Sequence, residues 1–546
     1  MIHIHKMRQL FFLLLITILL FSCKNENRDF SAKKIFRYNE SAGISSLDPA
    51  FAKDQANIWA CNQLYNGLVE LDNNLNINPC IANEWNITEN GCLYTFILRK
   101  DVCFIDNKCF NNTKRRVTAY DFEFSFKRIV DEKIASPGAW IFNYVKKESN
   151  NYAFKALNDS IFQIKLNQAF PPFLGLLSMQ YCSVIPHEAI EYYGKDFRNN
   201  PVGTGAFYLK LWKEGVKMVL LKNPDYFQFE ENERLPYLDA INISFIIDKQ
   251  SAFLEFAKGN LDFMSGIDAS YKDELLTFNG KLNPKYENKF NLISQAYLNT
   301  EYLGFLMDTV NLQNNPLKIK AVRQAINYGF DRVKMIKYLR NNIGTAALNG
   351  IIPKGLAGFD STFKNGYNFN PDKSRKLLAE AGFPGGKGLG EISLSTTASY
   401  LDLCRYIQNQ LAEIGIKLKI DVNPPATLRE MIAKSKTPFF RGSWIADYPD
   451  AENYLSLFYS PNFCPAGPNY THFKNKNFDL LYEKSQTETN DSIRFSYYKQ
   501  MDRIIIEEAP VVVLYYDQVL RFTQKNIKNI GSNPMNLLTL KRVKKD

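Results

Sequence analysis

The amino-acid sequence predicts an α/β protein, because strand and helix patterns follow one another along it and short glycine turns join them. Apolar and polar residues alternate over residues 94–98, as expected for a strand with one buried face. Residues 403–414 carry apolar side chains at helical spacing, Gly415 follows, and alternation returns over residues 416–420. Helices that lead directly into strands indicate layered α/β architecture with partly parallel sheets.

Other segments fit the same class. Residues 241–247 alternate like a second half-buried strand. Thr118-x-x-Asp121 has the form of a capping box and is followed by apolar residues at helical spacing. Asn370-Pro371 predicts the start of another helix, with proline at its first position.

The glycine-rich residues 382–390 superficially resemble a phosphate-binding loop. A P-loop needs Ser or Thr after its lysine to hold magnesium, and here Gly388 follows Lys387. The segment also comes after a helix and before a strand, which is the reverse of the order in a nucleotide loop. We therefore expect an ordinary helix-to-strand turn.

The N-terminus indicates export. Residues 10–21 form an apolar run that follows Lys6 and Arg8 and is too short to span a bilayer, so residues 1–22 are predicted to be a signal peptide. Leu20-Phe21-Ser22-Cys23 resembles the lipobox of bacterial lipoproteins, which implies acylation of Cys23. Residues 23–33 are a polar tether. We expect a protein anchored to a membrane by lipid, with its body on the periplasmic or extracellular side.

Composition limits the possible functions. A chain of 546 residues with 45% hydrophobic residues is too long for one core, so two or three domains are expected. The net charge of +11 is spread along the chain, whereas nucleic-acid binding favours a clustered basic stripe with aromatic platforms. We expect no nucleic-acid partner and a monomer.

Cysteine and histidine spacing argues against common enzyme classes. There is no Cys-x-x-Cys pair, and His187 and His472, the histidines that remain after signal cleavage, lack neighbours at metal-ligand spacing. Cys103 and Cys109 flank a predicted hairpin and are equally consistent with a disulfide or with free thiols. The sequence therefore predicts no cofactor, no metal and no enzymatic activity.

Asp447 is the most informative candidate site residue. It follows the mostly apolar, strand-like run Arg441-Gly442-Ser443-Trp444-Ile445-Ala446, and no intramolecular cation stands at a fixed spacing from it. An unpaired buried carboxylate costs several kcal/mol unless a cation neutralises it. The ammonium group of a ligand would serve, and a peptide N-terminus is the obvious candidate.

Several segments together resemble the extracellular solute-binding proteins, family 5, of peptide, oligopeptide and nickel ABC importers, and the match runs from about residue 34 to the C-terminus. The segments are Ser46-Leu47-Asp48-Pro49, Leu64-Tyr65-Asn66-Gly67-Leu68, residues 94–99 with Val102 and Phe104, residues 117–122, residues 200–207, Lys222-Asn223-Pro224-Asp225-Tyr226, Val322-Arg323-Gln324-Ala325, residues 441–450 and Asn475-x-x-Phe478-Asp479. The chain departs from the family pattern at Cys103, at residues 106–109, at Ala206 and at Ala451. These departures lie outside the segment that carries Asp447.

The resemblance implies a two-lobed, class II periplasmic-binding-protein-like α/β fold with an extra domain inserted in the first lobe. Lobe I would comprise residues 34–77, 200–299 and 514–546, the extra domain residues 78–199, and lobe II residues 300–513. Ligand would enter the cleft between the lobes, the lobes would close over it, and the closed form would deliver it to a membrane permease driven by an ATPase.

By the same resemblance, Arg441-x-x-Trp444-x-Ala446-Asp447 would contact the ligand. Asp447 would pair with its α-amino group, and the backbone from Gly442 to Ile445 would bind an extended peptide as an added strand. Arg441 would attract a carboxylate, Trp444 would wall a pocket, and Asn469 is a weaker candidate for an amide contact.

Each assignment has a structural alternative. Asp447 also suits a turn cap, Arg441 a bridge between domains, Trp444 the core and Asn469 its own loop. The ligand itself has alternatives on the same fold: a nickel chelate, haem or an oligosaccharide. A signalling receptor is another alternative on this fold. Different classes are a nutrient-capture lipoprotein with an all-helical superhelix, and an exported hydrolase.

Overall fold

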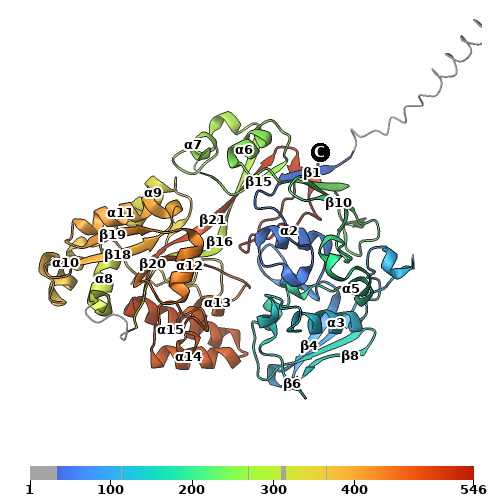
Figure 1. The fold of residues 1–546 in the computed structure, drawn as a ribbon, viewed down its shortest axis with the longest axis horizontal. Coiled ribbons are helices and arrows are strands. Elements are labelled where there is room, and N and C mark those ends of the chain that lie inside the picture. Colours follow the sequence, from blue (N-terminus) through green and yellow to red (C-terminus); the bar gives the residue numbers. More distant parts are fainter. Residues whose placement is uncertain (1–32, 112, 150, 269, 309–314, 364–365) are drawn as a thin grey trace, which may run out of the picture.

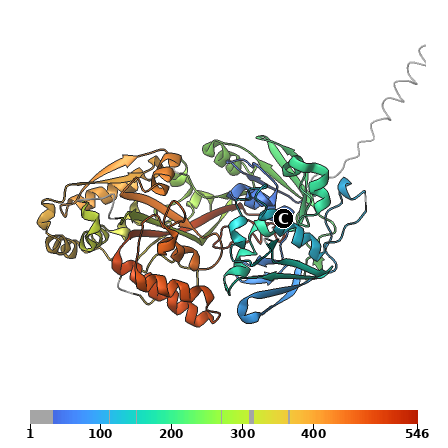
Figure 2. The same ribbon diagram turned by 60° about the horizontal axis from the view of Figure 1, so that its bottom comes forward.

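The computed structural model describes residues 33–111, 113–149, 151–268, 270–308, 315–363 and 366–546. The predicted signal peptide and Cys23 lie outside these residues. The described chain forms two halves that are joined by long strands, as Figure 1 and Figure 2 show from two directions. Within it, no helix is both long enough and apolar enough to cross a membrane.

One large sheet runs through both halves. In the described chain its strand order is β10-β11-β14-β1-β15-β21-β16-β20-β18-β19, and β17 pairs with β21. The two central strands, β16 (Phe290–Phe305) and β21 (Val511–Gln524), pair antiparallel over most of their length. Their register shifts between Ala296 and Thr300. The proposed lobe boundaries at 299/300 and 513/514 therefore fall inside this pair of strands.

The lobe I end of the sheet contains the first described strand of the chain. β1 (Ile35–Asn39) lies between β14 (Ala240–Ser244) and β15 (Phe263–Ser265), parallel to both. The strand predicted over residues 241–247 is shorter than expected, because β14 ends at Ser244. Ile247, beyond its end, is 82% exposed. The remaining lobe I elements are α2 (Gln55–Leu64), β2 (Val69–Leu71), β3 (Ile77–Pro79), β10 (Phe207–Lys213), β11 (Lys217–Lys222), β12 (Phe229–Glu230), β13 (Glu233–Arg234), α6 (Lys249–Ala257), α7 (Lys272–Leu275), β22 (Ile527–Lys528) and β23 (Lys544–Lys545).

The segment 78–199 builds a separate antiparallel sheet in the order β4-β5-β9-β8, with α3 packed against β8 and β9. Its elements are β4 (Ala82–Thr88), β5 (Leu93–Leu98), α3 (Ala119–Ile129), β6 (Lys147–Glu148), β7 (Asn151–Tyr152), β8 (Phe154–Asn158), β9 (Ile161–Lys165), α4 (Phe173–Leu176) and α5 (His187–Tyr193). The strand predicted over residues 94–98 is confirmed as β5. The capping box is also confirmed, because Thr118 N donates to Oδ2 of Asp121 at 2.8 Å at the start of α3.

Lobe II combines the other end of the sheet with helices on both faces (Figure 1). α11 (Leu401–Ala412) links the parallel strands β18 (Glu391–Thr396) and β19 (Lys417–Val422), which confirms the predicted helix, glycine turn and strand. The other elements are α8 (Lys320–Tyr328), α9 (Arg332–Leu339), β17 (Thr345–Ala346), α10 (Pro371–Glu380), α12 (Pro425–Ala433), β20 (Phe439–Ile445), α13 (Glu452–Leu455), α14 (Lys476–Thr487) and α15 (Asp491–Glu508).

The predicted turn over residues 382–390 is confirmed as the connection from α10 to β18. Asn370 caps α10 by accepting a hydrogen bond from Lys373 N, as its position before Pro371 predicted. Gly386 has a positive φ of 79°, and a Cβ atom there would lie 1.9 Å from the carbonyl oxygen of Gly415. Glycine is required at this point by close packing rather than by phosphate binding.

The architecture is therefore a two-lobed α/β fold, as expected. The all-helical superhelix is excluded, because the described chain contains a sheet of eleven strands. All eight described cysteines, including Cys103 and Cys109, are free thiols in this structure.

Candidate functional site

The strand that leads to Asp447 has one occupied edge and one open edge. β20 pairs with β16 along its whole length, from Phe439 opposite Phe305 to Ile445 opposite Asn299. On its other side, β18 pairs with it only at Phe440. Among the described strands, none covers that edge from Gly442 to Ile445. Its backbone groups can therefore pair with an extended ligand.

Gly442 is fixed by packing against the neighbouring strand. A Cβ atom at Gly442 would lie 2.8 to 3.0 Å from the ring atoms of Tyr302, which is buried in the lobe II core. Any side chain would force β20 away from β16. The glycine thus keeps the open strand in place.

Asp447 lies just beyond the C-terminal end of β20, and its side chain is exposed. The side chain of Asn453 in α13 hydrogen-bonds its carboxylate, and Oδ1 of Asn453 accepts from the Asp447 N–H at 3.3 Å. Desolvation by the surrounding protein raises the pKa of Asp447, and the bond from Asn453 opposes that rise. Within the described chain, Asp447 forms no ion pair with a lysine or arginine.

Trp444 is held by the same asparagine. Its Nε1–H donates to Oδ1 of Asn453 at 2.7 Å, and its side chain is partly buried against the lobe II core. Asn453 itself is 4% exposed. One buried amide therefore positions both the indole of Trp444 and the backbone of Asp447.

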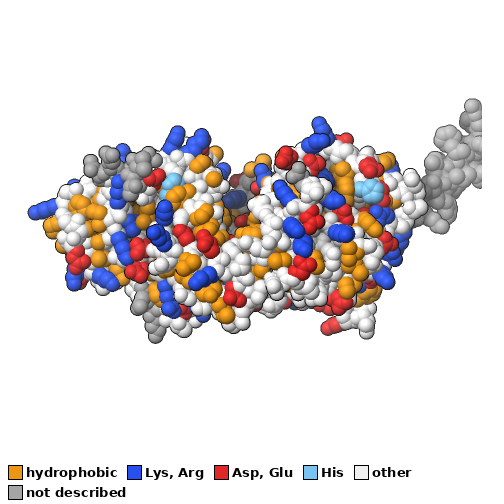
Figure 3. Space-filling model, turned by 90° about the horizontal axis from the view of Figure 1, so that it is seen from below, with side chains coloured by type: hydrophobic (Ala, Val, Ile, Leu, Met, Phe, Trp, Pro, Cys, Tyr) orange, Lys and Arg blue, Asp and Glu red, His pale blue; other side chains and the backbone are white. Residues whose placement is uncertain are grey.

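The loop that carries Asp447 meets the opposite half of the molecule. Tyr448 packs against Trp140 with ring centroids 6.2 Å apart, and a Cβ atom on Gly175 would lie 3.4 Å from Pro449. Burial raises the pKa of the Tyr181 phenol, and the negative charge of Asp447 adds to this rise. Asp447 therefore lies where lobe II meets the extra domain. Figure 3 shows the outline narrowing between the two halves.

Arg441 is paired within lobe II. Its guanidinium bonds the carboxylate of Glu301, which is 2% exposed, and it stacks on Tyr400 with Cζ 3.4 Å from the ring centroid. Burial raises the pKa of Glu301, while Arg441 opposes the rise. The buried Nε of Arg441 has no hydrogen-bond partner among the described residues. The ion pair leaves Arg441 less free to attract a ligand carboxylate than the sequence suggested.

Asn469 does not reach the cleft. It is 0% exposed, and its amide nitrogen donates to the carbonyls of Tyr459 and Phe473 at 3.1 and 3.0 Å. Its oxygen accepts from Thr471 Oγ1 and from Phe473 N. Both polar atoms of the Asn469 side chain are hydrogen-bonded within its own loop. The structure therefore favours the structural role of Asn469 over a ligand contact.

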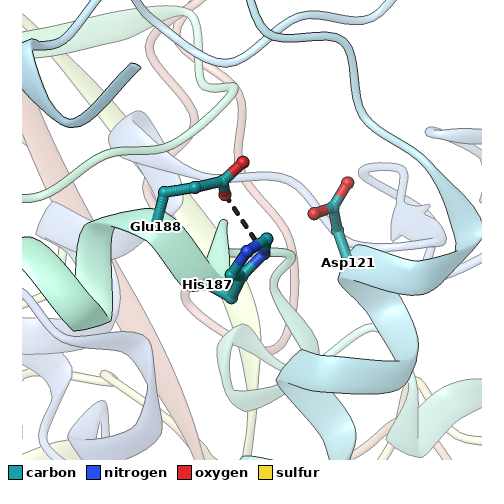
Figure 4. Close-up of side chains that lie close together, drawn as sticks. All are labelled: Asp121, His187 and Glu188. Carbon is teal, nitrogen blue, oxygen red and sulfur yellow. Dashed lines mark ion pairs between the residues drawn. The ribbon is translucent and has the colours of Figure 1, made fainter. Parts of the chain in front are cut away.

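One cluster of side chains has the composition of a metal site, but an arginine already neutralises its carboxylates. Asp121, His187 and Glu188 lie close together in the extra domain (Figure 4). Arg115 donates to Asp121 Oδ1 at 2.7 Å and to Glu188 Oε1 at 2.7 Å. A guanidinium between the two carboxylates would repel a divalent cation. We interpret the cluster as an ion-pair network that fastens α3 to α5.

In three dimensions both histidines have neighbours that the sequence spacing does not reveal. His187 lies beside Glu188 and Asp121, and His472 lies 3.3 Å from the sulfur of Cys464. Asn453 and Tyr181 are further residues near Asp447 that the sequence does not predict. Asn453 follows Asp447 by six residues and offers no motif, and Tyr181 comes from the other half of the molecule.

A cavity of about 280 Å³ lies wholly within lobe I and the extra domain, and Asp447 is not among its lining residues. Two charges in its wall, the buried Lys541 and the partly buried Glu70, pair with each other at 2.7 Å. Asp447, in contrast, has no ion-pair partner among the described residues. The two-lobed α/β fold, with an open strand edge beside Asp447, is the architecture of a solute-binding protein.

Comparison with known proteins gives the family. Residues 76–463 match the model of the bacterial extracellular solute-binding proteins, family 5 middle domain, and the chain belongs to that family. It is 25% identical to the glutathione-binding protein GsiB of Salmonella choleraesuis over 90% of this chain and 91% of that protein. It is 27% identical to heme-binding protein A of Haemophilus influenzae over 88% and 86% of the two chains.

A solved structure shows the same fold. The ABC transporter-associated periplasmic binding protein DppA from Helicobacter pylori, in complex with the peptide STSA, superposes with a TM-score of 0.74. The two chains are 25% identical, and the match covers 94% of this chain and 98% of that one. This similarity extends across both lobes and the extra domain.

Proposed function

We propose that this protein binds short peptides with a free N-terminus in the cleft between its lobes and delivers them to the permease and ATPase of an ABC importer. The observation that carries the proposal is the position of Asp447. Its carboxylate is ionisable, exposed and without an ion-pair partner in the described chain, and it lies at the end of a strand with an open edge. A peptide α-ammonium supplies the missing cation.

The rest of the peptide binds along the open edge of β20. Backbone groups from Gly442 to Ile445 pair with the peptide main chain, which gives affinity without dependence on side-chain identity. Trp444 lies beside this edge and walls the space for a ligand side chain. Family membership and the peptide complex of the Helicobacter pylori relative support the same ligand class.

The decisive experiment compares free and N-acetylated forms of the same peptide by isothermal titration calorimetry. Acetylation removes the positive charge that pairs with Asp447, so the acetylated form is expected to bind poorly. Asp447→Asn is expected to weaken binding of the free form by roughly 2–5 kcal/mol, the usual loss when one partner of a buried charge pair is removed. Asp402→Asn, at an acid that is 85% exposed, is the matched control and should bind normally. Equal affinity for both peptides would refute the proposal.

Haem is the second candidate ligand, because a relative that matches 88% of this chain is a heme-binding protein. Native mass spectrometry of protein purified from its own host separates the two candidates by the mass of the retained ligand. Haem would also give a Soret absorption band, and a peptide would not. Incubation with peptides, followed by mass spectrometry, checks that none is hydrolysed.

We further propose that acylation of Cys23 anchors the protein to the membrane, on the basis of the lipobox-like residues 20–23. Mass spectrometry of the N-terminal peptide is expected to show a cleaved chain with acyl groups on that cysteine. Cys23→Ala should abolish acylation and release the protein from the membrane fraction. An unmodified, uncleaved N-terminus in the native protein would contradict the anchor.

A further inference from the structure

Four donor atoms converge at the opposite end of β20 from Asp447. They are Sγ and the carbonyl oxygen of Cys464, Nε2 of His472 and Oγ of Ser435. Nε2 lies 3.3 Å from Sγ, 3.1 Å from the carbonyl oxygen and 3.2 Å from Oγ, and Sγ lies 3.2 Å from Oγ. Ser435 follows α12, and the other donors belong to the loop before α14.

This cluster is separate from the ligand cleft. Met307 N, at the end of β16, donates to the carbonyl of Thr471, which places the loop beside the Phe439 end of β20. A seven-residue strand spans about 20 Å, so the length of β20 separates the cluster from Asp447. The cluster is therefore outside the proposed peptide site.

The contacts of the two ring nitrogens of His472 suit a metal ligand. A neutral imidazole has one N–H donor and one acceptor nitrogen. Nδ1 of His472 lies 3.4 Å from a carboxylate oxygen of Asp308, and Nε2 lies 3.1 Å from the carbonyl oxygen of Cys464. With the proton on Nδ1 directed at Asp308, the lone pair of Nε2 faces Sγ of Cys464 and Oγ of Ser435. A metal ion in that position would use the Nε2 lone pair and leave the proton on Nδ1 for Asp308.

The spacing of the donors fits such an ion. In tetrahedral zinc sites with Zn–N of 2.0–2.1 Å and Zn–S near 2.3 Å, adjacent ligand atoms lie about 3.3–3.6 Å apart. The separations here are 3.1–3.3 Å, so small side-chain rotations would open the site to that size. The pairing of one thiolate with one imidazole favours a thiophilic ion over magnesium or calcium.

The surroundings hold the histidine as metal ligands are commonly held. Asp308 lies on the ring nitrogen opposite the donor cluster, which is the usual carboxylate–histidine–metal arrangement. Phe463 stacks on the imidazole at 4.6 Å with an interplanar angle of 5°. The His472 side chain keeps 12% exposure, which opens a path from solvent, whereas Cys464 is 4% exposed.

We propose that Cys464, His472 and Ser435, with the main-chain carbonyl of Cys464, form a binding site for Zn(II), and that Asp308 is a positioning residue for His472. Binding replaces the thiol proton of Cys464, which is released to solvent, and forms the sulfur–metal bond. The ion joins the loop before α14 to the segment after α12. It therefore stabilises lobe II and plays no part in peptide contact.

The test uses the full-length protein, stripped of metal with a chelator and titrated with Co(II) as a spectroscopic probe for Zn(II). We expect a thiolate-to-cobalt charge-transfer band in the near ultraviolet, which stoichiometric Zn(II) abolishes. Cys464→Ser should remove the band. Asp308→Asn should weaken Co(II) binding by about 10- to 100-fold, as removal of such carboxylate partners does. Cys404→Ser, at a buried lobe II thiol within an apolar cluster, is the matched control and should keep the band.

A second readout does not depend on cobalt chemistry. Zn(II) should raise the thermal unfolding midpoint of the native protein and of Cys404→Ser, and should leave that of His472→Gln unchanged. Absence of the band in the native protein, or its persistence in Cys464→Ser, would overturn the proposal in favour of a His472 imidazolium paired with Asp308. Peptide affinity measured on the same samples should not change with Zn(II), so the two proposals fail independently.

Discussion

The side-chain oxygen of Asn453 accepts a 2.7 Å hydrogen bond from the indole N–H of Trp444, and it also accepts from the backbone N–H of Asp447 at 3.3 Å. The carboxylate of Asp447 is hydrogen-bonded by the same asparagine side chain. Three features of the proposed site thus depend on one buried residue that contacts no ligand in the proposal. In the proposed function, Asn453 acts as a positioning residue for the peptide N-terminus.

Replacing Asn453 by alanine is expected to weaken peptide binding by about 10-fold or more. The change leaves the Trp444 N–H without its partner and frees the Asp447 loop, and each lost buried partner costs about 1–3 kcal/mol. Calorimetry with a free-N-terminus peptide measures the loss. Asn342→Ala, at an exposed asparagine of lobe II, is the control. Unchanged affinity in Asn453→Ala would show that Asp447 does not depend on it.

Peptide affinity should fall as the pH is lowered through the pKa of Asp447. Desolvation raises this pKa in the ligand-free protein, and a bound ammonium would lower it, so binding releases a proton from the protonated acid. Affinity is therefore greatest above the raised pKa and is lost progressively below it. Calorimetry over an acidic pH series checks this, and Asp447→Asn should flatten the profile. A pH-independent affinity in the native protein would contradict the assigned role.

Removing one partner of the Arg441–Glu301 ion pair is expected to reduce the stability of the protein more than replacing both partners. Glu301→Gln leaves a largely buried guanidinium without its counter-ion, and breaking a buried pair on one side costs about 3–5 kcal/mol. The double variant Glu301→Gln with Arg441→Met should recover part of that loss, because no charge remains buried. Chemical denaturation of Glu301→Gln, of Arg441→Met alone and of the double variant gives the coupling energy.

The control for this cycle is a surface pair in the same lobe. Glu430 and Lys434 lie 2.6 Å apart, and both side chains are more than half exposed. Glu430→Gln is expected to change stability by less than about 1 kcal/mol. If Glu301→Gln changed the free energy of unfolding as little as Glu430→Gln, the ion pair of Arg441 with Glu301 would not contribute to stability.

Asp502 should make the stability of lobe II depend on pH. It is 4% exposed, burial raises its pKa to about 7, and the backbone N–H of Ile351 opposes the rise by donating to it at 2.8 Å. The folded protein therefore holds a proton that the unfolded chain releases above about pH 4. Stability from this group is full below that pH and falls by about 4 kcal/mol as the pH rises to about 7.

Denaturant unfolding between pH 4 and 8 measures this slope. Asp502→Asn keeps an oxygen that accepts from Ile351 N and does not titrate, so the part of the slope due to Asp502 should disappear. Asp360, which Arg503 pairs at 2.8 Å and whose pKa is lowered to about 2, is the comparison, because it does not titrate in this range. An unchanged slope in Asp502→Asn would assign it to other groups.

The sequence alone determined the local elements and the class of protein. The capping box before α3, the proline that opens α10 and the glycine turn before β19 are short-range signals, because each depends on residues within a few positions. The same holds for the strand that leads to Asp447, where an acid follows an apolar run. One failure was local: the strand after residue 240 ended three residues earlier than its alternation predicted.

Only the tertiary structure decided which side chains are available to a ligand. Arg441 and Asn469 have suitable chemistry, but the fold pairs Arg441 with Glu301, 140 positions away, and encloses Asn469 in its own loop. Cys464 and His472 show no metal spacing in the sequence. In the fold their loop turns back, with a left-handed backbone conformation at His472, and Nε2 of His472 lies next to the sulfur of Cys464. Partners for charged and polar groups come from distant segments, and sequence periodicity carries no information about such contacts.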